Sequence, residues 1–520
     1  MSSGEIAAYR FGLLAVLAFG AMLRFSALDF GGSVWAVHPD EQNVLSVLRA
    51  MDRGDLDYFE VAYGGGYYYP LHAFFAAYRR WVSPPAMDSQ PRDIFGNSLE
   101  AYVAARVWSA LLSTLGVWLT FVVGTRVSGR LAGLLAAGMV ASSPLAVRDA
   151  HLAKADSACA FAVTVLLLAL VRTGAGPRRW LPIGAAAGLA ASIKYMVGPI
   201  PAVVAAFAQP STSAGPRRRA WRVAGGITLG TAVFLTLNPF WASSPGRTWW
   251  FFQRLVRSQR EYVAHPWFAD VGIHPIPYHA AVSLRYGCGL LMALLALPSV
   301  WLGWRQHGSR RLLGLTVVGQ WIILATNPLA LARNFLPCIP ALAVLVADLL
   351  AVCLGRLRIR PRPRVAIALL ALVALEPAAR ATTLVRIMSR PDTRTLADRW
   401  MATNVPRQAT VVVAGAPPGA PSYGAPGLGL PLMERKVSPS IAPAEVPTFV
   451  VWHHYPIPYS SAPAPEGVRA GTPTALFDPF SGPLRHPVFE PFDAFYLPLA
   501  GFSGVRSPGP RIEIFAVNAR

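Results

Sequence analysis

The chain has 520 residues, of which 54% are hydrophobic and 14% are charged, whereas soluble domains carry about 25% charged residues. Its 47 basic and 26 acidic residues give a net charge of +21, but the basic residues lie in short runs between apolar stretches of membrane-spanning length. These features argue against a soluble enzyme and against a nucleic-acid-binding protein, in which basic residues would line one polar face. We therefore expect an α-helical polytopic membrane protein without a nucleic-acid partner.

Ten apolar segments recur along the first 380 residues, and most are close to the ~20 residues that cross a bilayer. The first segment, 11–29, lacks a small-residue cleavage site, so we expect a retained membrane span rather than a signal peptide. The others occupy 101–124, 130–147, 157–172, 180–208, 222–240, 285–304, 312–327, 335–355 and 364–380.

Five short connections between these segments contain 17 arginines and no acidic residue, so the positive-inside rule places them in the cytoplasm. The connections before and after 180–208 are both in this set. That stretch must then start and end inside, and we expect two short segments broken near Lys194–Pro199. The prediction is eleven membrane segments with a cytoplasmic N-terminus.

This topology places five regions outside the cell: 30–100, 148–156, 241–284, 327–334 and everything after about 381. The outer loop 30–100 carries nine acidic residues against five arginines, in agreement with the assignment. We expect a membrane-embedded catalytic domain over 1–380 and a small extracytoplasmic C-terminal domain over 381–520.

The tail differs in composition, with 21 prolines after residue 400. Short β-like runs at Thr410–Gly415, Thr448–Tyr455 and Arg511–Val517 indicate a small domain that is α/β or mostly irregular. The proline-rich stretch 416–431 is interpreted as a loop. We find no internal repeat, which weakens a reading as a transporter with two related halves.

Two adjacent carboxylates, Asp40 and Glu41, follow His38 just after the first segment. Such groups are costly at a membrane boundary unless they face water, a cation or a substrate. A second motif, Tyr63–His72, combines glycines, tyrosines and a histidine ahead of an aromatic segment at 73–82. We expect helices along the outer membrane surface there, with the tyrosines as interfacial anchors.

Further charged candidates lie at the outer ends of other segments. The loop 148–156 packs five ionisable groups into nine residues, and its two aspartates could brace two cations toward an anionic group. Lysine is rare in this chain, since only Lys154, Lys194 and Lys436 occur among the basic residues. The outer-face candidates are Arg148, Lys154, Asp156, Lys194, the adjacent Tyr195, and Arg333.

These motifs, in this order and topology, resemble the polyprenyl-phosphate-dependent glycosyltransferases of the C superfamily (GT-C). The resemblance rests on His-Pro-Asp-Glu at 38–41, the charged loop 148–156, Gly-Leu-Ala-Ala-Ser-Ile-Lys-Tyr at 188–195, Leu-Asn-Pro-Phe at 237–240 and Arg-Asn-Phe-Leu-Pro-Cys-Ile-Pro at 333–340. Within the superfamily they are similar to the family 39-like group, which includes protein O-mannosyltransferases and the lipid A aminoarabinose transferase. The resemblance covers about residues 1–380 and extends weakly into 393–400.

The resemblance implies an enzyme that moves a sugar from a polyprenyl-phosphate donor to a protein, lipid or glycan acceptor. It implies catalytic roles for Asp40 and Glu41, with Asp40 as the general base, because a positioned carboxylate speeds deprotonation of a hydroxyl by about 10²–10⁴-fold. The cations would bind the departing lipid phosphate. The binding residues would be His38, Arg148, Lys154, Asp156, Lys194, Tyr195 and Arg333.

The resemblance leaves several points open. No cofactor is certain, and a divalent metal held by Glu41 and His38 remains an option. The sugar, the acceptor and the oligomeric state are not specified. We expect location in the inner (plasma) membrane, in contact with its lipids, with the active site facing outside.

Two other classes of function fit part of the pattern. A secondary transporter would use intramembrane charges, with Asp348 as a relay carboxylate, but its charges should lie at the midplane rather than the outer rim. A non-catalytic membrane assembly protein would share the topology, and the cluster His38–Glu41 would have no required role in it.

Overall fold

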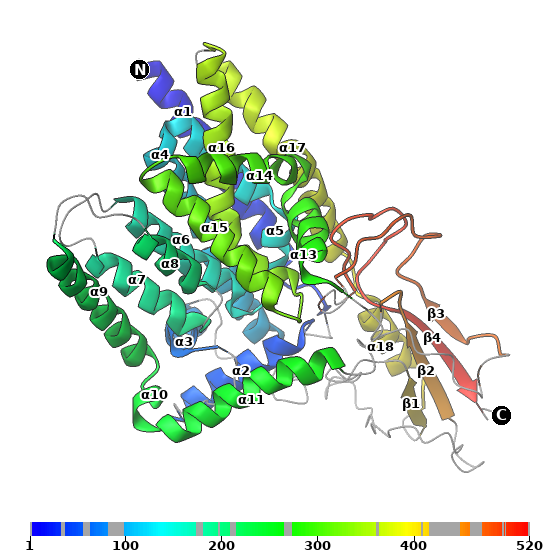
Figure 1. Ribbon diagram of the computed structural model, residues 1–520. Coiled ribbons are helices and arrows are strands. Elements are labelled where there is room, and N and C mark those ends of the chain that lie inside the picture. The colour runs from blue at the N-terminus through cyan, green and yellow to red at the C-terminus, as the bar shows by residue number, and fades with distance from the viewer. Residues whose placement is uncertain are drawn as a thin grey trace.

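The computed structural model describes residues 3–32, 37–55, 63–81, 98–172, 180–195, 198–208, 215–264, 273–359, 363–406, 409–414, 448–457, 468, 471–490, 493 and 496–517. Every apolar segment predicted from the sequence coincides with a helix (Figure 1). The bundle contains α1 (Ser3–Phe25), α4 (Leu99–Ser142), α6 (Ala155–Arg172), α7 (Trp180–Ile193), α8 (Pro199–Ala208), α9 (Pro216–Leu237), α14 (Leu290–Arg305), α15 (Ser309–Thr326), α16 (Ile339–Arg356) and α17 (Pro363–Met388).

Shorter helices connect these elements: α2 (Pro39–Asp52), α3 (Gly65–Trp81), α5 (Pro144–Ala150), α10 (Phe240–Ser243), α11 (Pro245–Ala264), α13 (Pro275–Tyr278), the π-helix η3 (His279–Tyr286) and the 3₁₀-helix η4 (Ala332–Cys338). Among the described residues, six segments are long and apolar enough to cross a membrane, and α7, α8 and α14 are shorter apolar helices. The predicted α-helical membrane fold is confirmed, while the number of eleven segments stays a prediction.

Two predicted interruptions of the apolar segments are present. The 180–208 stretch divides into α7 and α8 on either side of Lys194 and Tyr195. Helix α4 has non-helical backbone angles at Ser128 and Gly129, where φ of Gly129 is +85°. A Cβ on Gly133 would lie 2.6 Å from the carbonyl oxygen of Phe121, twelve residues earlier, whereas a straight helix would separate such residues by about 18 Å. Residues 99–142 therefore fold back as two helices, as the segments 101–124 and 130–147 predict.

Glycines set the close packing of α7 on α9. Each helix carries two glycines four residues apart, Gly184 and Gly188 on α7 and Gly226 and Gly230 on α9. A Cβ at Gly184 would lie 1.9 Å from the Gly226 carbonyl oxygen, and one at Gly188 would lie 2.2 Å from that of Gly230. This small-residue spacing allows helix backbones to approach closely in a bilayer.

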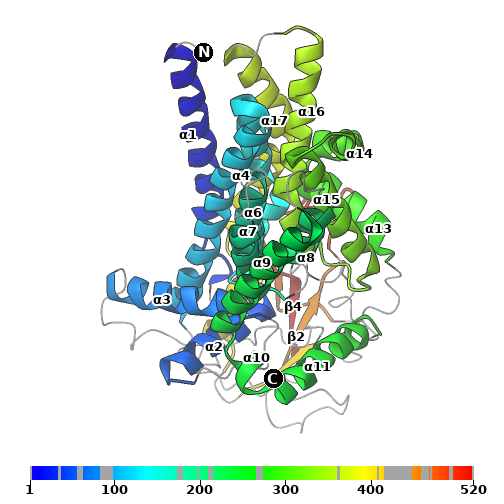
Figure 2. The ribbon, with the colours of Figure 1, turned by 60° about the vertical axis from the view of Figure 1, so that its left-hand side comes forward.

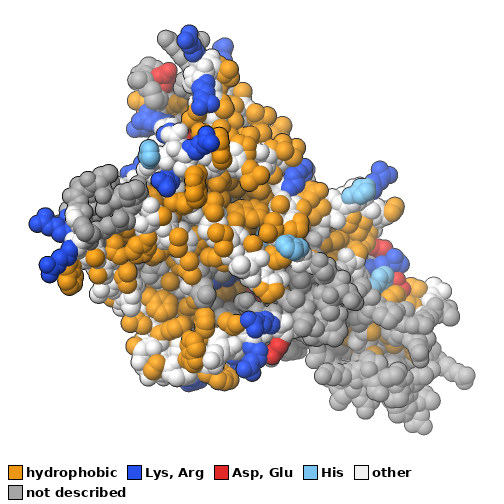
Figure 3. Space-filling view, in the orientation of Figure 1, with side chains coloured by type: hydrophobic (Ala, Val, Ile, Leu, Met, Phe, Trp, Pro, Cys, Tyr) orange, Lys and Arg blue, Asp and Glu red, His pale blue; other side chains and the backbone are white. Residues whose placement is uncertain are grey.

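The surface of the bundle is apolar. Figure 3 shows a broad hydrophobic surface over the helices, and large side chains such as Phe11, Leu297 and Leu375 are 75%, 82% and 72% exposed. Exposure of this extent is expected of side chains that face lipid rather than water. The N-terminus and the connected ends of α16 and α17 lie at one end of the bundle, and the C-terminal sheet lies at the other (Figures 1 and 2). Which of these two ends faces the cytoplasm stays a prediction.

Helices α3 and α11 run crosswise to the bundle near the end that carries the sheet (Figure 2). Helix α3 (Gly65–Trp81) contains most of the Gly-Tyr motif and the described part of the aromatic segment, residues 73–81, so a helix is present there as predicted. That α3 lies along the outer membrane surface stays a prediction.

The C-terminal region contains α18 (Thr393–Asn404) and a four-stranded sheet of β1 (Thr410–Ala414), β2 (Thr448–His454), β3 (Ala475–Phe477) and β4 (Arg511–Val517), in the order β1-β2-β4-β3. The β1–β2 pair is parallel and the other pairs are antiparallel. Met401 of α18 packs with Val451, Ile512 and Ile514 in a small core. The three predicted strands are present, β3 was not foreseen, and the stretch 416–431 lies outside the described residues.

Candidate active site

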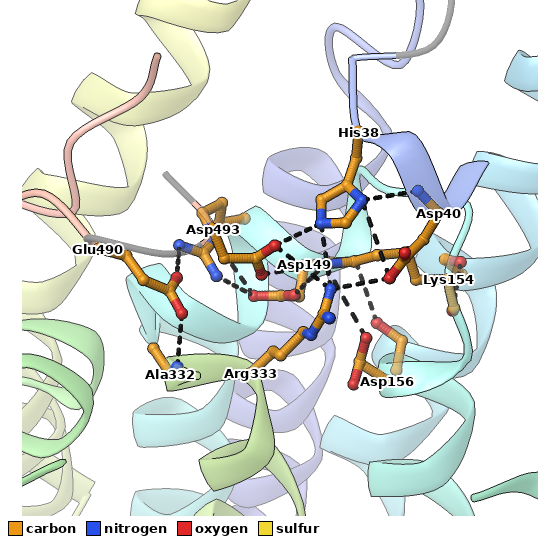
Figure 4. Close-up of polar contacts among 12 residues, drawn as sticks. His38, Asp40, Asp149, Lys154, Asp156, Ala332, Arg333, Glu490 and Asp493 are labelled. Carbon is orange, nitrogen blue, oxygen red and sulfur yellow. Dashed lines mark hydrogen bonds and ion pairs between the residues drawn. The ribbon is translucent and has the colours of Figure 1, made fainter. Parts of the chain in front are cut away.

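Charged side chains from separate parts of the chain converge in one cluster (Figure 4). They come from the start of α2, the region from the end of α5 to the start of α6, the break after α7, the start of η4, and the C-terminal region before β4. Nearly all of the predicted site residues are in this cluster.

Asp40 is the most exposed carboxylate of the cluster, since 27% of its side chain is accessible. Its Oδ2 accepts hydrogen bonds from Arg333 Nη1 and Tyr63 Oη, both at 2.9 Å. Burial raises the pKa of Asp40, but the charges of Arg333, His38 and Lys154 together lower it by more. The net pKa of Asp40 therefore lies below the ordinary value. Asp40 is therefore ionised at neutral pH and able to accept a proton.

His38 is the N-cap of α2. Its Nδ1 accepts the backbone N–H of Asp40 at 3.0 Å, so this nitrogen carries no proton. The proton is then on Nε2, which donates to the carboxylate of Asp493. Arg333 Nη1 lies 3.1 Å from the same Nε2, which makes this a close approach rather than a hydrogen bond. The ring of His38 thus joins the first turn of α2 to the C-terminal region.

Glu41, unlike its accessible neighbour Asp40, is fully buried. Its two oxygens pair with Arg106 Nε at 2.8 Å and Nη2 at 3.0 Å. They also accept the backbone N–H groups of Val37, His38 and Ala153. Burial raises the pKa of Glu41, but the charge and hydrogen bonds of Arg106 lower it below the ordinary value. All these contacts fix the start of α2 against α4 and the α5–α6 connection.

Lys154 is fully buried among three carboxylates. Its Nζ lies 3.3 Å from Asp149, 3.5 Å from Asp493 and 3.9 Å from Asp156. Burial lowers the pKa of Lys154, and these carboxylates raise it above the ordinary value. The ammonium therefore stays charged. It lies at the buried centre of the cluster and not at its open side, the side on which Asp40 is accessible.

Lys194 and Arg333 are the cations that reach the open side, with 16% and 15% of their side chains exposed. Lys194 Nζ donates to Asp156 at 2.7 Å and to Asn334 at 2.9 Å. Because Asn334 follows Arg333 in η4, the two cations are held next to each other.

Arg148 lies deeper and links the bundle to the C-terminal region. It pairs with Asp149 at 2.9 Å and with Glu490 at 2.6 Å. The other oxygen of Glu490 accepts the backbone N–H of Ala332 at 2.5 Å. Arg148 is only 3% exposed, so it braces the site and does not face its opening.

An apolar groove begins next to the cluster. It has a volume of about 370 Å³ and lies between α7, α8 and α9. Its lining extends from Trp180 at one end of α7 to Tyr195 just beyond the other, and the ring of Tyr195 packs against Phe234 and Trp241. Tyr195, the neighbour of Lys194, thus belongs to the groove rather than to the charged cluster.

The donor atoms around His38 and Glu41 do not suit a metal. Both Glu41 oxygens are engaged by Arg106 and backbone N–H groups, and His38 Nδ1 accepts the Asp40 N–H. In the part of the chain that the structure describes, no group of three or more His, Cys, Asp or Glu residues has metal-binding geometry. The carboxylates of the cluster pair with cations instead.

Sequence reasoning missed Glu490, Asp493 and Arg106 and gave Tyr63 only an anchoring role. Glu490 and Asp493 lie in a proline-rich tail that has no periodicity to place them. Arg106 lies inside an apolar segment, and an arginine at such a position is itself a signal of a buried partner.

Comparison with known proteins gives a family match over part of the chain and a fold shared with solved structures. Residues 92–241 match the family model described as dolichyl-phosphate-mannose-protein mannosyltransferase. No curated protein matches the chain at the sequence level. Among solved structures, the apo form of ArnT from Cupriavidus metallidurans is similar with a TM-score of 0.51 and 15% identity, over 84% of this chain and 92% of that one.

Two further structures are similar at lower scores. ArnT from the same organism bound to undecaprenyl phosphate has a TM-score of 0.49 and 15% identity, over 87% and 93% of the two chains. The apo oligosaccharyltransferase from Archaeoglobus fulgidus has 0.46 and 13%, over 78% and 62%. The family match and the shared fold with ArnT confirm the resemblance to GT-C membrane glycosyltransferases that the motifs predict.

Proposed function

We propose that this multi-pass membrane glycosyltransferase transfers a sugar from a polyprenyl-phosphate donor to an acceptor on the extracytoplasmic side of the inner membrane. The observation that carries the proposal is the pairing of an accessible, ionised Asp40 with Arg333, next to Lys194 at the mouth of an apolar groove. The family whose model matches residues 92–241 is named for a dolichyl-phosphate-linked sugar, which supports a donor of this class.

Asp40 acts as the general base in this mechanism. Arg333 and Tyr63 both bind its Oδ2, and Oδ1 makes no hydrogen bond to any residue that the structure describes. This oxygen is available to take the proton of an acceptor hydroxyl as that hydroxyl attacks the anomeric carbon. Glu41 holds Arg106 and the start of α2, so we assign it a positioning role instead of the catalytic role that the sequence suggested.

Lys194 and Arg333 stabilise the leaving phosphate. Two of the three N–H groups of the Lys194 ammonium are engaged by Asp156 and Asn334, which leaves one donor for a ligand. The Nε and Nη2 atoms of Arg333 make no hydrogen bond within the described part of the chain, so one edge of its guanidinium can also bind phosphate. Preplaced cations are what the developing negative charge requires. Lys154 and Arg148 act through the carboxylates that they brace.

The isoprenoid chain of the donor lies in the groove between α7, α8 and α9. The groove follows α7 for about 20 Å, the length of a 14-residue helix, and Tyr195 brings its lining to within one residue of Lys194. An apolar channel that leads to a phosphate-binding cation fits a lipid whose head carries the charge.

The reaction side follows from the topology. The site includes residues of the C-terminal domain, which lies at the opposite end of the bundle from the N-terminus (Figures 1 and 2). The arginine-rich connections favour a cytoplasmic N-terminus. These observations support an active site that faces outside, where donor lipids and envelope acceptors meet.

A transporter reading receives no support from Asp348. Its carboxylate pairs with Arg310 at 2.9 Å and with Ser128, at the turn inside α4. These partners belong to the connections assigned to the cytoplasmic side, so Asp348 fastens two turns together and is not a relay at the midplane.

The test uses membranes that contain the protein and a panel of radiolabelled polyprenyl-phosphate sugars, with label followed into protein, lipid and glycan fractions. We expect transfer from at least one donor, and loss of that transfer in Asp40→Asn. The matched control is Asp52→Asn, which removes an exposed carboxylate on the same helix and should retain transfer. Absence of transfer from every donor would overturn the proposal.

The groove can be tested separately with Ala191→Phe, which narrows it near Tyr195. The donor KM should rise for long-chain donors and change little for a short-chain analogue. The matched control is Ala185→Phe, on the same helix but outside the groove lining. Equal effects on both donors would contradict the placement of the isoprenoid chain.

A further inference from the structure

We infer that the C-terminal domain completes the active site by supplying Asp493, a positioning residue that holds His38 and Arg333 and through them orients Asp40. This inference rests on the proposed function and assigns part of the site to a domain that the sequence resemblance barely reaches. It also gives the C-terminal domain a role in the reaction beyond its place at the membrane surface.

The first link runs through His38. Asp493 accepts the Nε2 proton of His38, which leaves Nδ1 free to accept the backbone N–H of Asp40 at 3.0 Å. That bond caps the first turn of α2, the turn that presents the Asp40 side chain. Without Asp493 the ring could adopt the other tautomer, in which Nδ1 carries a proton and cannot accept the Asp40 N–H.

The second link runs through Arg333. A single guanidinium nitrogen, Nη1, lies 2.9 Å from Asp40 and 3.3 Å from Asp493. The two carboxylates therefore hold Nη1 of Arg333 between them (Figure 4). Among the described residues, the edge formed by Nε and Nη2 has no carboxylate partner and is left for the donor phosphate. Loss of Asp493 would leave Asp40 as the remaining carboxylate on this nitrogen. Arg333 could then pair with Asp40 alone and shift toward its carboxylate.

The third link is electrostatic. The other oxygen of Asp493 lies 3.5 Å from the fully buried Lys154. Besides Tyr63, the groups that act on Asp40 are the cations Arg333 and Lys154, His38, and the like charge of Asp493. The cations lower the pKa of Asp40 and Asp493 raises it, so Asp493 limits how far the base is weakened.

Glu490 fastens this arrangement three residues earlier in the chain. It pairs with Arg148 and accepts the N–H of Ala332, the residue just before Arg333. Both Glu490 and Asp493 are almost fully buried against the bundle, with exposures of 0% and 5%. Carboxylates at such a depth are stable only when they pair with cations. The C-terminal segment can therefore dock only when Arg148, Lys154 and Arg333 are in place, and its docking in turn orders these residues.

The experiment measures kcat, donor KM and the pH profile of transfer for the full chain carrying Asp493→Asn or Asp493→Ala. Asp478→Asn serves as the matched control, because Asp478 is a partly exposed aspartate of the same domain paired with Arg511. We expect kcat to fall by about 10- to 100-fold in Asp493→Ala, since misplacing a catalytic group by about 1 Å costs up to ~10²-fold. The donor KM should change by less than about threefold, because the phosphate-binding edges are not removed.

Asp493→Asn separates positioning from packing. Its amide oxygen can still accept the His38 proton, so it should retain more activity than Asp493→Ala. Its missing charge should lower the pKa of Asp40 and move the acid limb of the pH profile to lower pH. The Asp478→Asn control should match the wild type in kcat and in pH profile.

Two results would overturn the inference. Wild-type kcat and an unmoved acid limb in Asp493→Asn would leave Asp493 a docking contact only. Tighter donor binding with unchanged kcat would make Asp493 an anion that the donor phosphate replaces. Asp40→Asn is assayed in parallel, because an active Asp40→Asn removes the proposed function itself, whereas an inactive Asp40→Asn beside an unaffected Asp493→Asn removes only this inference.

Discussion

Glu41→Gln should destabilise the protein strongly, although it changes only an oxygen into an amide nitrogen. The carboxylate accepts five hydrogen bonds, two from Arg106 and three from backbone N–H groups, and each oxygen faces at least two donors. Whichever way the glutamine amide is turned, its NH₂ group opposes donors, and Arg106 loses its counter-charge. Breaking a buried ion pair in this way costs about 3–5 kcal/mol.

The assay is the thermal unfolding midpoint of the purified protein in lipid nanodiscs. Asp52→Asn is the control, because Asp52 also has two partners, His72 and Arg79, but is 37% exposed and lies outside the apolar segments. Exposed pairs contribute only about 0–1 kcal/mol, so this midpoint should barely move. A Glu41→Gln protein as stable as the wild type but inactive would refute the reasoning and return Glu41 to the chemistry.

The same carboxylate predicts a pH dependence of stability. The pKa of Glu41 is lower in the folded protein than its ordinary value of about 4.3. Its contribution to the free energy of unfolding is therefore complete above that value and is lost as the pH falls through the lowered folded pKa. The wild-type midpoint should fall on acidification below about pH 4.3 by more than the Glu41→Gln midpoint does. Parallel slopes for the two proteins would contradict the ion pair.

Three other predictions follow from single contacts. Lys194→Ala should weaken donor use by about 1.5–3 kcal/mol, measured as donor turnover, while Lys194→Arg retains part of it; wild-type turnover in Lys194→Ala would refute the phosphate role. Gly188→Leu should force α7 from α9 and lower the unfolding midpoint, since overpacking costs about 1–3 kcal/mol, and an unchanged midpoint would speak against close helix contact. A reporter that is active only in the cytoplasm should be silent when fused after Arg520, and a strong signal would reverse the topology.

The helices and three of the four strands could be predicted from the sequence because their signals are local. Apolar length, arginine runs and the lysine at 194 located the spans and the break between α7 and α8. The runs at 410–415, 448–455 and 511–517 carry enough β-branched and aromatic residues to indicate strands. The three-residue strand β3 carries too little pattern to be recognised.

The site was predictable only in part, because its members meet across long sequence separations. The residues near 40, 150, 194 and 333 stood out as charges at span ends. Asp493 did not, since it lies 455 residues from its partner His38 in a segment without periodicity. The resemblance favoured Asp40 as the base, but nothing in the sequence indicated that Glu41 is structural. Neighbours on a helix point about 100° apart, so Asp40 is accessible whereas Glu41 is buried against Arg106.

The most direct test of the mechanism is a single-turnover transfer experiment in proteoliposomes with a radiolabelled polyprenyl-phosphate sugar. Wild type and Asp40→Asn are compared at saturating donor, with donor binding measured on the same samples. Asparagine keeps the shape of aspartate but accepts no proton at neutral pH, so transfer should slow by about 10²-fold or more while donor binding is retained. Transfer by Asp40→Asn at the wild-type rate, with the donor consumed equally by both proteins, would contradict the assignment of Asp40 as the base.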